Sequence, residues 1–309
     1  MKIIFMGTPE FALPCLENLY NKYGIEAVFT KIDKPNARGK KIIYNPIKEF
    51  ALKKNIKIYQ PLNFKDDEIL KTLKEINPDL IVVVAYGKIL PKEVLDIPKY
   101  GVINVHSSLL PKYRGAAPIN AAIINGEKES GVSVMKVVEE LDAGPVILSE
   151  KVAIDDMDNF LSLHDKLKNI GAKILIDACE LIFENKANAI PQDESKATFV
   201  KPFKKEDGKI DWNNDRRKIF NMVRGMSPLP CAYTFLNEKL FKIYEVEEYD
   251  KNYFGVNGEV VDFIKGKGVV VKVEDGVVIL KSVKPENKKV LSGVDIINGK
   301  YFSKGDVLC

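Results

Sequence analysis

Short apolar runs alternate with amphipathic stretches along the first half of the chain. The runs at residues 2–6, 27–30 and 80–85 are rich in β-branched or aromatic side chains, as buried strands are. Residues 80–85 contain no polar position at all, which is typical of a strand covered on both faces of a parallel sheet. Strands that alternate with helices predict an α/β fold with a doubly wound, mostly parallel sheet.

Helix starts are marked by capping residues. Thr8 and Asn45 each precede a proline, and Asp66 or Asp67 precedes a third helical pattern, so each is expected to cap a helix. A long helix is predicted over 159–185. Its expected buried stripe consists of Leu161, Leu163, Leu167, Ile170, Ile174, Leu175, Ala178 and Leu181.

The pattern changes after residue 189. Residues 190–208 are polar, contain proline and lack periodicity, so they are expected to be a linker. From residue 232 onward, short strand-like runs alternate with glycine turns, which predicts a small β barrel. The predicted organisation is a first domain at 1–189, the linker, and a second domain at 209–309.

The candidate chemistry lies where the run 101–106 ends. Asn104 and His106 are two positions apart, so they face the same side of a strand. The carboxyl end of a strand is where an open α/β sheet binds ligands. An amide can stabilise an oxyanion, and an imidazole can hold or move a proton near neutral pH. The alternative is an ordinary core pair satisfied by the backbone.

Asp142 is the third candidate. It stands just before Gly144 and between predicted strands at 131–136 and 145–148, so a tight turn can bring its carboxylate to the imidazole of His106. Taken alone, Asp142 would be an ordinary turn residue. The three residues together favour acyl-transfer chemistry.

Composition narrows the class of protein. The chain has 309 residues, of which 46% are hydrophobic, enough for a sizeable core and about two domains. Its four cysteines are scattered, so neither a disulfide framework nor a zinc site is indicated. Asp155, Asp156 and Asp158 fit a helix-capping turn, and no metal is expected. With no apolar run of membrane-spanning length, we expect a cytoplasmic protein with no membrane partner.

The charge distribution fits either a polyanionic partner or a lysine-rich solvated surface. Residues 201–309 carry 20 basic and 16 acidic side chains, whereas residues 1–200 carry 27 of each, so the net charge of +4 lies in the last third. Residues 31–41 form a basic stretch broken by proline and glycine, which predicts a mobile loop at the same rim as Asn104. Such a loop can contact a phosphate backbone, or it can be an ordinary surface loop.

Several motifs together resemble the 10-formyltetrahydrofolate-dependent formyltransferases. Asn104, His106, the run 108–111 with Gly115, and Asp142 before Gly144 match that family's signature in order. Arg38, Lys40 and Lys41 resemble an insertion that binds the acceptor stem of tRNA in the methionyl-tRNA branch. The chain also opens with Gly-Thr-Pro-Glu-Phe-Ala, as that branch does.

The resemblance implies a formyltransferase that carries the formyl group of 10-formyltetrahydrofolate to the α-amine of initiator methionyl-tRNA. It implies catalytic roles for Asn104, His106 and Asp142 and tRNA contacts from Arg38, Lys40 and Lys41. It also implies an OB-like second domain that binds tRNA, and a monomer is the expected form. The implied folate contacts are Ser108, Leu109, Leu110, Pro111, Tyr86 and Ile89.

Three alternatives stay open at this point. A formyltransferase acting on a sugar-nucleotide amine would share the catalytic trio, although the basic loop argues against it. A catalytically silent RNA-binding or folate-sensing protein would not need the trio. A dinucleotide-dependent dehydrogenase is disfavoured because the chain has no G-x-G-x-x-G motif after its first strand.

Overall fold

A computed structural model describes residues 1–35, 42–64 and 66–309. The chain divides into two compact units. The first contains residues 1–118, 130–153 and 164–200, and the second contains 119–129, 154–163 and 201–309. The unit boundary at residue 201 therefore falls inside the predicted linker, and two short pieces of the predicted first domain belong to the second unit. The proposed functional division at 1–189, 190–208 and 209–309 stays a prediction.

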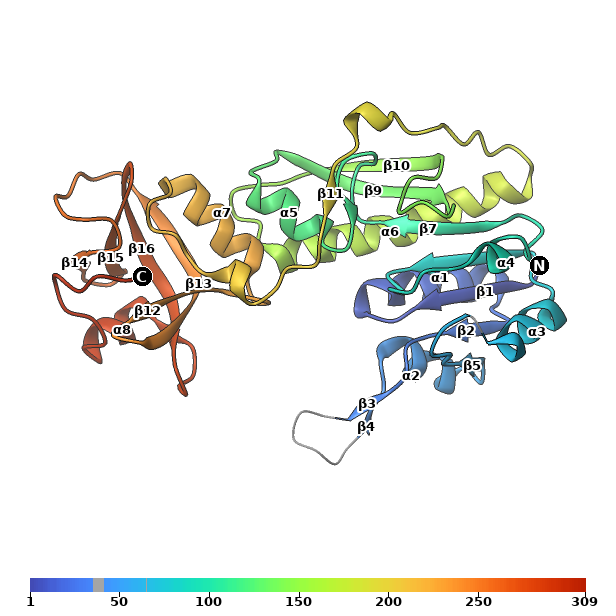
Figure 1. Ribbon diagram of the computed structural model, residues 1–309, viewed down its shortest axis with the longest axis horizontal. Helices are drawn as coiled ribbons and strands as arrows, with labels where there is room; N and C mark the ends of the chain where they lie inside the picture. Colours follow the sequence, from blue (N-terminus) through green and yellow to red (C-terminus); the bar gives the residue numbers. More distant parts are fainter. Residues whose placement is uncertain (36–41, 65) are drawn as a thin grey trace. The chain divides into compact units, whose positions relative to one another are not determined.

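The first unit is built on a seven-stranded sheet in the order β10-β9-β7-β6-β1-β2-β5 (Figure 1). Its five strands from β7 to β5 run parallel, and β9 is antiparallel to β7. The mostly parallel α/β sheet predicted from the sequence is confirmed. The strands are β1 (Ile3–Gly7), β2 (Ala27–Phe29), β5 (Lys57–Tyr59), β6 (Leu80–Val84), β7 (Val102–His106), β9 (Glu129–Lys136) and β10 (Val146–Ala153).

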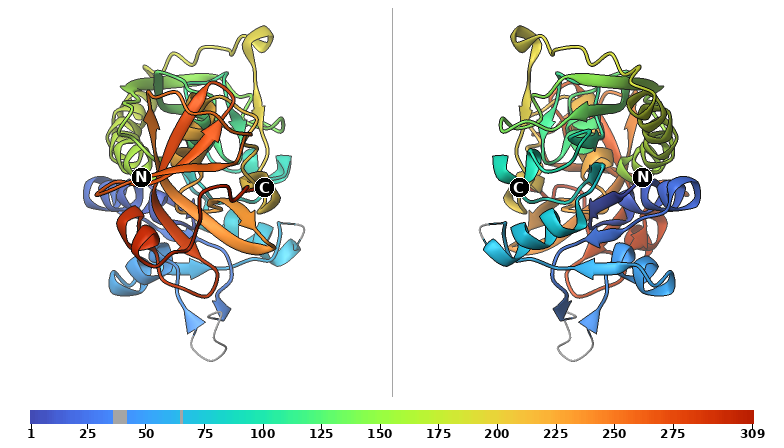
Figure 2. Two further views of the ribbon diagram at one scale, coloured as in Figure 1. Left: turned by 90° about the vertical axis from the view of Figure 1, so that its left-hand side faces the viewer. Right: turned by 90° about the vertical axis from the view of Figure 1, so that its right-hand side faces the viewer.

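Helices cover both faces of this sheet. Figure 2 shows α1 (Leu13–Tyr23) and α6 (Phe160–Phe183) on one side and α3 (Asp67–Ile76) on the other. The side chain of Asn18 in α1 donates to the carbonyl of Ala172 in α6 at 3.2 Å. On the face of α3, a buried cluster combines the alternate strand positions Ile4, Met6, Ala27, Phe29 and Ile81 with Leu73 of α3. Burial on both faces explains the uninterrupted apolar runs.

Two of the three predicted helix caps are found. Asn45 caps α2 (Pro46–Lys53) by accepting from the backbone N–H of Lys48, and Asp66 caps α3 by accepting from that of Glu68. Thr8 as a helix cap was wrong. A 3₁₀ turn at Glu10–Ala12 precedes α1, so the helix starts later at Leu13. The Thr8 hydroxyl instead lies 3.4 Å from the backbone nitrogen of Lys31.

The second unit contains an antiparallel sheet in the order β12-β13-β16-β15-β14, with β17 beside β16. The final residues bridge its two edge strands: Cys309 exchanges backbone hydrogen bonds with Phe235 of β12, and Asp306 accepts from Val260 of β14. This closure gives the small barrel that the glycine turns predicted. Its strands are β12 (Ala232–Leu236), β13 (Lys239–Tyr249), β14 (Val260–Ile264), β15 (Gly268–Val273), β16 (Gly276–Pro285) and β17 (Leu291–Ser292).

Three helices belong wholly or mainly to the second unit: α5 (Pro118–Ile124), α7 (Arg216–Met226) and α8 (Gly293–Asn298). The Asn120 side chain of α5 donates to the carbonyl of Gly225 in α7 at 2.7 Å. A Cβ at Gly225 would lie 2.7 Å from the Ile124 side chain, so glycine permits this close helix contact. The sequence pattern did not predict α5.

Four short strands form two further ladders. β3 (Lys34–Pro35) pairs with β4 (Ile42–Ile43), and β8 (Arg114–Gly115) pairs in parallel with β11 (Phe199–Val200). The stretch 31–41 was predicted to be loop throughout, and at Lys34–Pro35 that prediction was wrong because the backbone there pairs with β4. The β8–β11 ladder places part of the predicted linker against the candidate catalytic loop.

The thiols provide a test of the core. Cys15, Cys179 and Cys231 are buried and Cys309 is exposed, and burial raises the pKa of the Cys15 and Cys179 thiols to about 12. We expect one thiol of the native protein to react rapidly with a colorimetric disulfide reagent at pH 8, because the thiolate is the reactive form. Denaturation should release the other three. Rapid reaction of two or more native thiols, or a rapid phase that persists in Cys309→Ser, would contradict this packing.

Candidate active site

Asn104 and His106 end strand β7 as the sequence predicted, and they lie on the same face of it. In the sheet, Asn104 is opposite Val83 of β6 and Met135 of β9, while His106 is opposite Ser133 of β9. His106 is buried, with 6% of its surface exposed, and Asn104 is half-buried. Among the described residues, none hydrogen-bonds the Asn104 side chain, so its amide is available to a ligand.

The two ring nitrogens of His106 have different surroundings. Nε2 lies 2.9 Å from the backbone carbonyl oxygen of Tyr113. Because a carbonyl can only accept, Nε2 carries a hydrogen and donates it. Nδ1 lies 3.7 Å from Oδ2 of Asp142, which is longer than a direct hydrogen bond. Nδ1 is therefore the ring nitrogen without a hydrogen-bond partner among the described residues.

Asp142 reaches the site from a strained turn. Its φ of 49° is in the left-handed region, which is uncommon for a residue with a side chain. The carboxylate Oδ2 accepts a hydrogen bond from the backbone N–H of Gly115 at 2.8 Å. Two residues later, a Cβ on Gly144 would lie 1.7 Å from the carbonyl oxygen of Lys136. Only glycine fits there, so the Asp-x-Gly spacing has a steric reason.

Serine hydroxyls fix the loop between β7 and β8. The Ser108 hydroxyl donates to the carbonyl of Lys112 at 2.6 Å, which closes the loop on itself. The Ser133 hydroxyl of β9 donates to the carbonyl of Ser108 at 2.8 Å and accepts from the Leu110 N–H at 3.2 Å. These bonds satisfy buried polar groups that would otherwise destabilise the fold. They also hold the loop against the neighbouring strand.

A buried arginine lies beside the site and was missed from the sequence. Arg114 is only 2% exposed and forms a two-bonded pair with Glu194, at 2.9 Å from Nη1 and 2.6 Å from Nη2. Its Nε and Nη2 also donate to Oε1 of Gln192, at 3.1 and 2.9 Å. Arg114 directly precedes Gly115 of the family signature, but its partners are 78 and 80 positions away, so no local pattern indicated them.

The residues predicted to contact folate lie in different environments. Leu109, Leu110 and Pro111 are half-buried on the loop after β7. Ile89 is 88% exposed, whereas Tyr86 is 1% exposed within the core. Among the described residues, the Tyr86 hydroxyl is the one buried side-chain polar atom without a hydrogen-bond partner, and burial raises its pKa. Ser108 is also buried, with its hydroxyl engaged as above.

The predicted tRNA contacts Arg38, Lys40 and Lys41 lie outside the described residues. Next to them, Asp33 forms an ion pair with Lys48 and accepts a hydrogen bond from the Gln60 side chain at 3.1 Å. The hydrogen bond from Lys48 is the main reason that the pKa of the Asp33 carboxyl lies below its usual value. These residues anchor the chain where the basic stretch begins.

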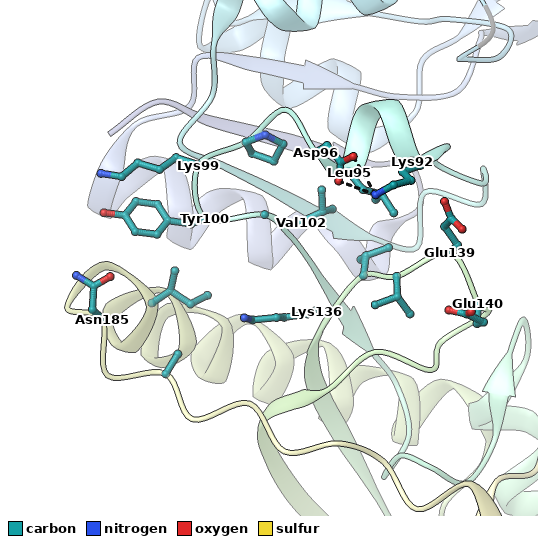
Figure 3. A pocket seen from close by; sticks show the side chains of 16 residues that line it. Lys92, Leu95, Asp96, Lys99, Tyr100, Val102, Lys136, Glu139, Glu140 and Asn185 are labelled. Carbon is teal, nitrogen blue, oxygen red and sulfur yellow. Dashed lines mark hydrogen bonds and ion pairs between the residues drawn. The ribbon is translucent and has the colours of Figure 1, made fainter.

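A cavity of about 840 Å³ lies at the opposite end of β7 (Figure 3). Its lining includes Lys99, Tyr100, Lys136 and Glu139 but none of the candidate catalytic residues. A second cavity, of about 580 Å³, lies beside the Asp142 turn and is lined in part by Arg114 and Glu194. Cavity size alone would therefore select the end of the strand opposite to the candidate catalytic residues.

Two other features are absent from the part of the chain that the structure describes. No group of three or more His, Cys, Asp or Glu side chains is arranged to hold a metal ion. Asp158 instead accepts hydrogen bonds from the Asp155 N–H and the Ser162 hydroxyl, as a capping turn does. No described helix is both long and apolar enough to cross a membrane.

Comparison with known families gives matches in both parts of the chain. The Formyl transferase profile matches residues 1–179, and the Formyl transferase, C-terminal domain profile matches residues 202–301. The methionyl-tRNA formyltransferase of Fusobacterium nucleatum subsp. nucleatum is 62% identical over 310 residues, with 100% of each chain covered. That of Clostridium tetani is 45% identical over 309 residues, covering 100% of this chain and 99% of the relative.

Solved structures share the fold at low sequence identity. WlaRD, a sugar 3N-formyl transferase crystallised in the presence of dTDP and 5-N-formyl-THF, has a TM-score of 0.67 and 22% identity, with 94% of this chain and 99% of that chain covered. HypX from Aquifex aeolicus in complex with tetrahydrofolic acid has a TM-score of 0.64 and 17% identity. The match covers 100% of this chain and 50% of HypX.

Proposed function

We propose that this chain, which belongs to the methionyl-tRNA formyltransferase family, takes the formyl group of 10-formyltetrahydrofolate and places it on the α-amine of initiator methionyl-tRNA. The observation that carries this proposal is the full-length match to a curated methionyl-tRNA formyltransferase at 62% identity. The catalytic, folate and tRNA residues named below are our assignments within that activity. We expect a monomer to be the active form.

The rim around β7 has groups that fit a folate. Its flat heterocycle needs apolar surface with a few polar contacts. Leu109, Leu110 and Pro111 are partly exposed on the loop after β7, and Ile89 is exposed after β6. The Tyr86 hydroxyl, which has no hydrogen-bond partner among the described residues, lies in the same connection between β6 and α4 (Lys92–Leu95). When bound, the folate supplies the activated formyl group, and we assign these side chains and Ser108 to holding it.

Asn104 and His106 are the groups we assign to stabilising negative charge. When an amine adds to a formyl carbon, charge develops on the formyl oxygen, and donors aimed at that oxygen lower the barrier. The Asn104 amide has no hydrogen-bond partner among the described residues and can donate there. The His106 ring is held by its Nε2–H bond to Tyr113, which leaves Nδ1 to face the reacting atoms, and we assign the protonated ring to the same oxyanion.

Asp142 is the group we assign to accepting the proton of the attacking amine. Its carboxylate faces Nδ1 of His106 at 3.7 Å, so we assign it to holding the imidazole in orientation. The same carboxylate can collect the proton that the attacking amine must lose, directly or through one water. The hydrogen bond from the Gly115 N–H to Oδ2 holds the carboxylate in place. The backbone of Asp142 has a positive φ, so the turn depends on such contacts to keep its conformation.

The basic stretch at residues 31–41 is the part we assign to substrate choice. We expect Arg38→Ala, Lys40→Ala, Lys41→Ala to raise KM for methionyl-tRNA by about 30-fold, because three phosphate or base contacts are lost. The salt dependence of that KM should also become shallower. The measurement is transfer of labelled formyl from 10-formyltetrahydrofolate to methionyl-initiator tRNA, with wild type and variant side by side at several salt concentrations.

A matched control removes three exposed lysines elsewhere in the same unit: Lys71→Ala, Lys74→Ala, Lys99→Ala. It should retain wild-type KM for tRNA. An equal increase in KM for tRNA in both triple variants would show a general charge effect and would exclude Arg38, Lys40 and Lys41 from the tRNA site. No transfer to tRNA by wild type, together with transfer to an amino-sugar nucleotide, would preserve the chemistry and overturn the proposed acceptor.

A further inference from the structure

The segment 190–200 is built into the active-site loop, although its composition is that of a linker. The backbone N–H of Tyr113 donates to the Thr198 hydroxyl, and that of Arg114 donates to the Thr198 carbonyl, both at 2.8 Å. Ala116 then donates to the carbonyl of Val200 at 3.0 Å. A Cβ on Gly115 would lie 2.4 Å from that same Val200 oxygen. The segment and the loop are therefore packed backbone to backbone.

Gln192 uses both ends of its amide within this arrangement. Its Nε2 donates to the carbonyls of Asp142 and Gly144, at 2.8 and 2.7 Å. Its Oε1 accepts from Nε and Nη2 of Arg114. The carbonyls can only accept and the guanidinium can only donate, so the orientation of the amide is fixed. One side chain thus ties the Asp142 turn to Arg114.

Arg114 provides a rigid support for Gln192. Its guanidinium is buried and held by two bonds to Glu194, and planar two-bonded pairs of this kind restrict geometry strongly. The backbone of the next residue, Gly115, donates to the Asp142 carboxylate. The Asp142 turn is consequently held at its carbonyl by Gln192 and at its carboxylate by Gly115.

We propose that Gln192 is a positioning residue for catalysis: by fixing the backbone at Asp142 and Gly144, it sets where the Asp142 carboxylate stands relative to His106. The proposal rests on the function proposed above. A positioning role requires that the side chain at position 192 carry a donor toward the turn and an acceptor toward Arg114. If the side chain only filled space, neither group would be needed.

Two variants separate these requirements. Gln192→Met keeps the length of the side chain and removes its four hydrogen bonds to Arg114, Asp142 and Gly144. Gln192→Glu keeps the acceptor toward Arg114 but turns a carboxylate oxygen toward two carbonyls. We expect kcat to fall about 10-fold in the first and up to about 100-fold in the second, because small displacements of catalytic groups have effects of this size. KM for each substrate should change little, because we assign Gln192 no contact with either substrate.

The controls exclude a general loss of structure. Lys196→Ala alters an exposed side chain of the same segment that pairs only with Asp193 in the described structure, and it should behave as wild type. The pH dependence of kcat should shift in both Gln192 variants, since the Asp142 carboxylate moves relative to the imidazole. An unchanged kcat, or a change confined to KM, would overturn the positioning role.

Hydrogen exchange supplies a readout that does not depend on the acceptor substrate. The peptide covering residues 139–146 should exchange faster in both Gln192 variants than in wild type and in Lys196→Ala, even if an individual variant is less stable overall. Unchanged exchange in that peptide would sink the proposal. Failure of the wild type to formylate tRNA, with this local change intact, would instead count against the proposed acceptor.

Discussion

Asn104→Ala should lower kcat about 100- to 1,000-fold, the usual effect of removing one preorganised donor to a developing oxyanion. KM for tRNA and folate should change little, because the donor acts mainly when charge appears on the formyl oxygen. The structural basis is the half-buried Asn104 amide on the His106 face of β7, without a hydrogen-bond partner among the described residues. Steady-state kinetics with both substrates varied would give the two parameters separately.

Two further variants make this expectation specific. Asn104→Asp is nearly the same size but places a carboxylate where a donor is needed, so it should be less active than Asn104→Ala. Lys136→Ala changes an exposed position of β9 that lines the cavity at the other end of β7, and it should retain wild-type kcat. If Asn104→Ala altered only substrate affinity, the oxyanion role would be wrong.

Asp142→Asn should lower kcat by about 100- to 10,000-fold, the usual effect of losing a general base or the group that orients an imidazole. The substitution preserves size and can keep the bond from Gly115, so the expected loss comes from the charge facing Nδ1 of His106. Single-turnover kinetics that start from a preformed complex of enzyme and 10-formyltetrahydrofolate would isolate the chemical step.

Glu140→Gln is the matched control for Asp142→Asn. It removes one acidic charge from an exposed position two residues earlier, so it tests whether acidity near the turn matters in general. We expect wild-type kinetics. A Glu140→Gln variant as impaired as Asp142→Asn would point to a long-range charge effect, and an Asp142→Asn variant with normal turnover would remove Asp142 from the proposed mechanism.

Local patterns were sufficient to predict much of the fold. The β-branched run 80–85 indicated a strand buried on both faces, and β6 lies in the middle of the sheet. The caps Asn45 and Asp66 were predictable because each hydrogen-bonds a backbone group within three residues. Strand β5 was missed because it is short and at the edge of the sheet, with exposed or half-buried positions, where burial leaves little pattern in the sequence.

Part of the candidate site was predictable from local sequence patterns and the family resemblance. Asn104 and His106 followed from strand periodicity, and Asp142 followed from its glycine turn together with the family resemblance. The partners Gln192 and Glu194 could not be predicted, since their role depends on a contact with Arg114 about 80 positions earlier. Their surroundings are polar, so the segment has the composition of a flexible connection.

The segment 190–200 also determines where the chain can be divided if its C-terminal part is to be exchanged with that of another protein. A catalytic module cut at residue 189 would lack Gln192, Glu194 and the strand that pairs with β8. A module that continues through Val200 would retain all of them. Exchange of C-terminal modules between relatives should therefore preserve turnover only when the crossover lies beyond Val200, whatever the acceptor that the new module brings.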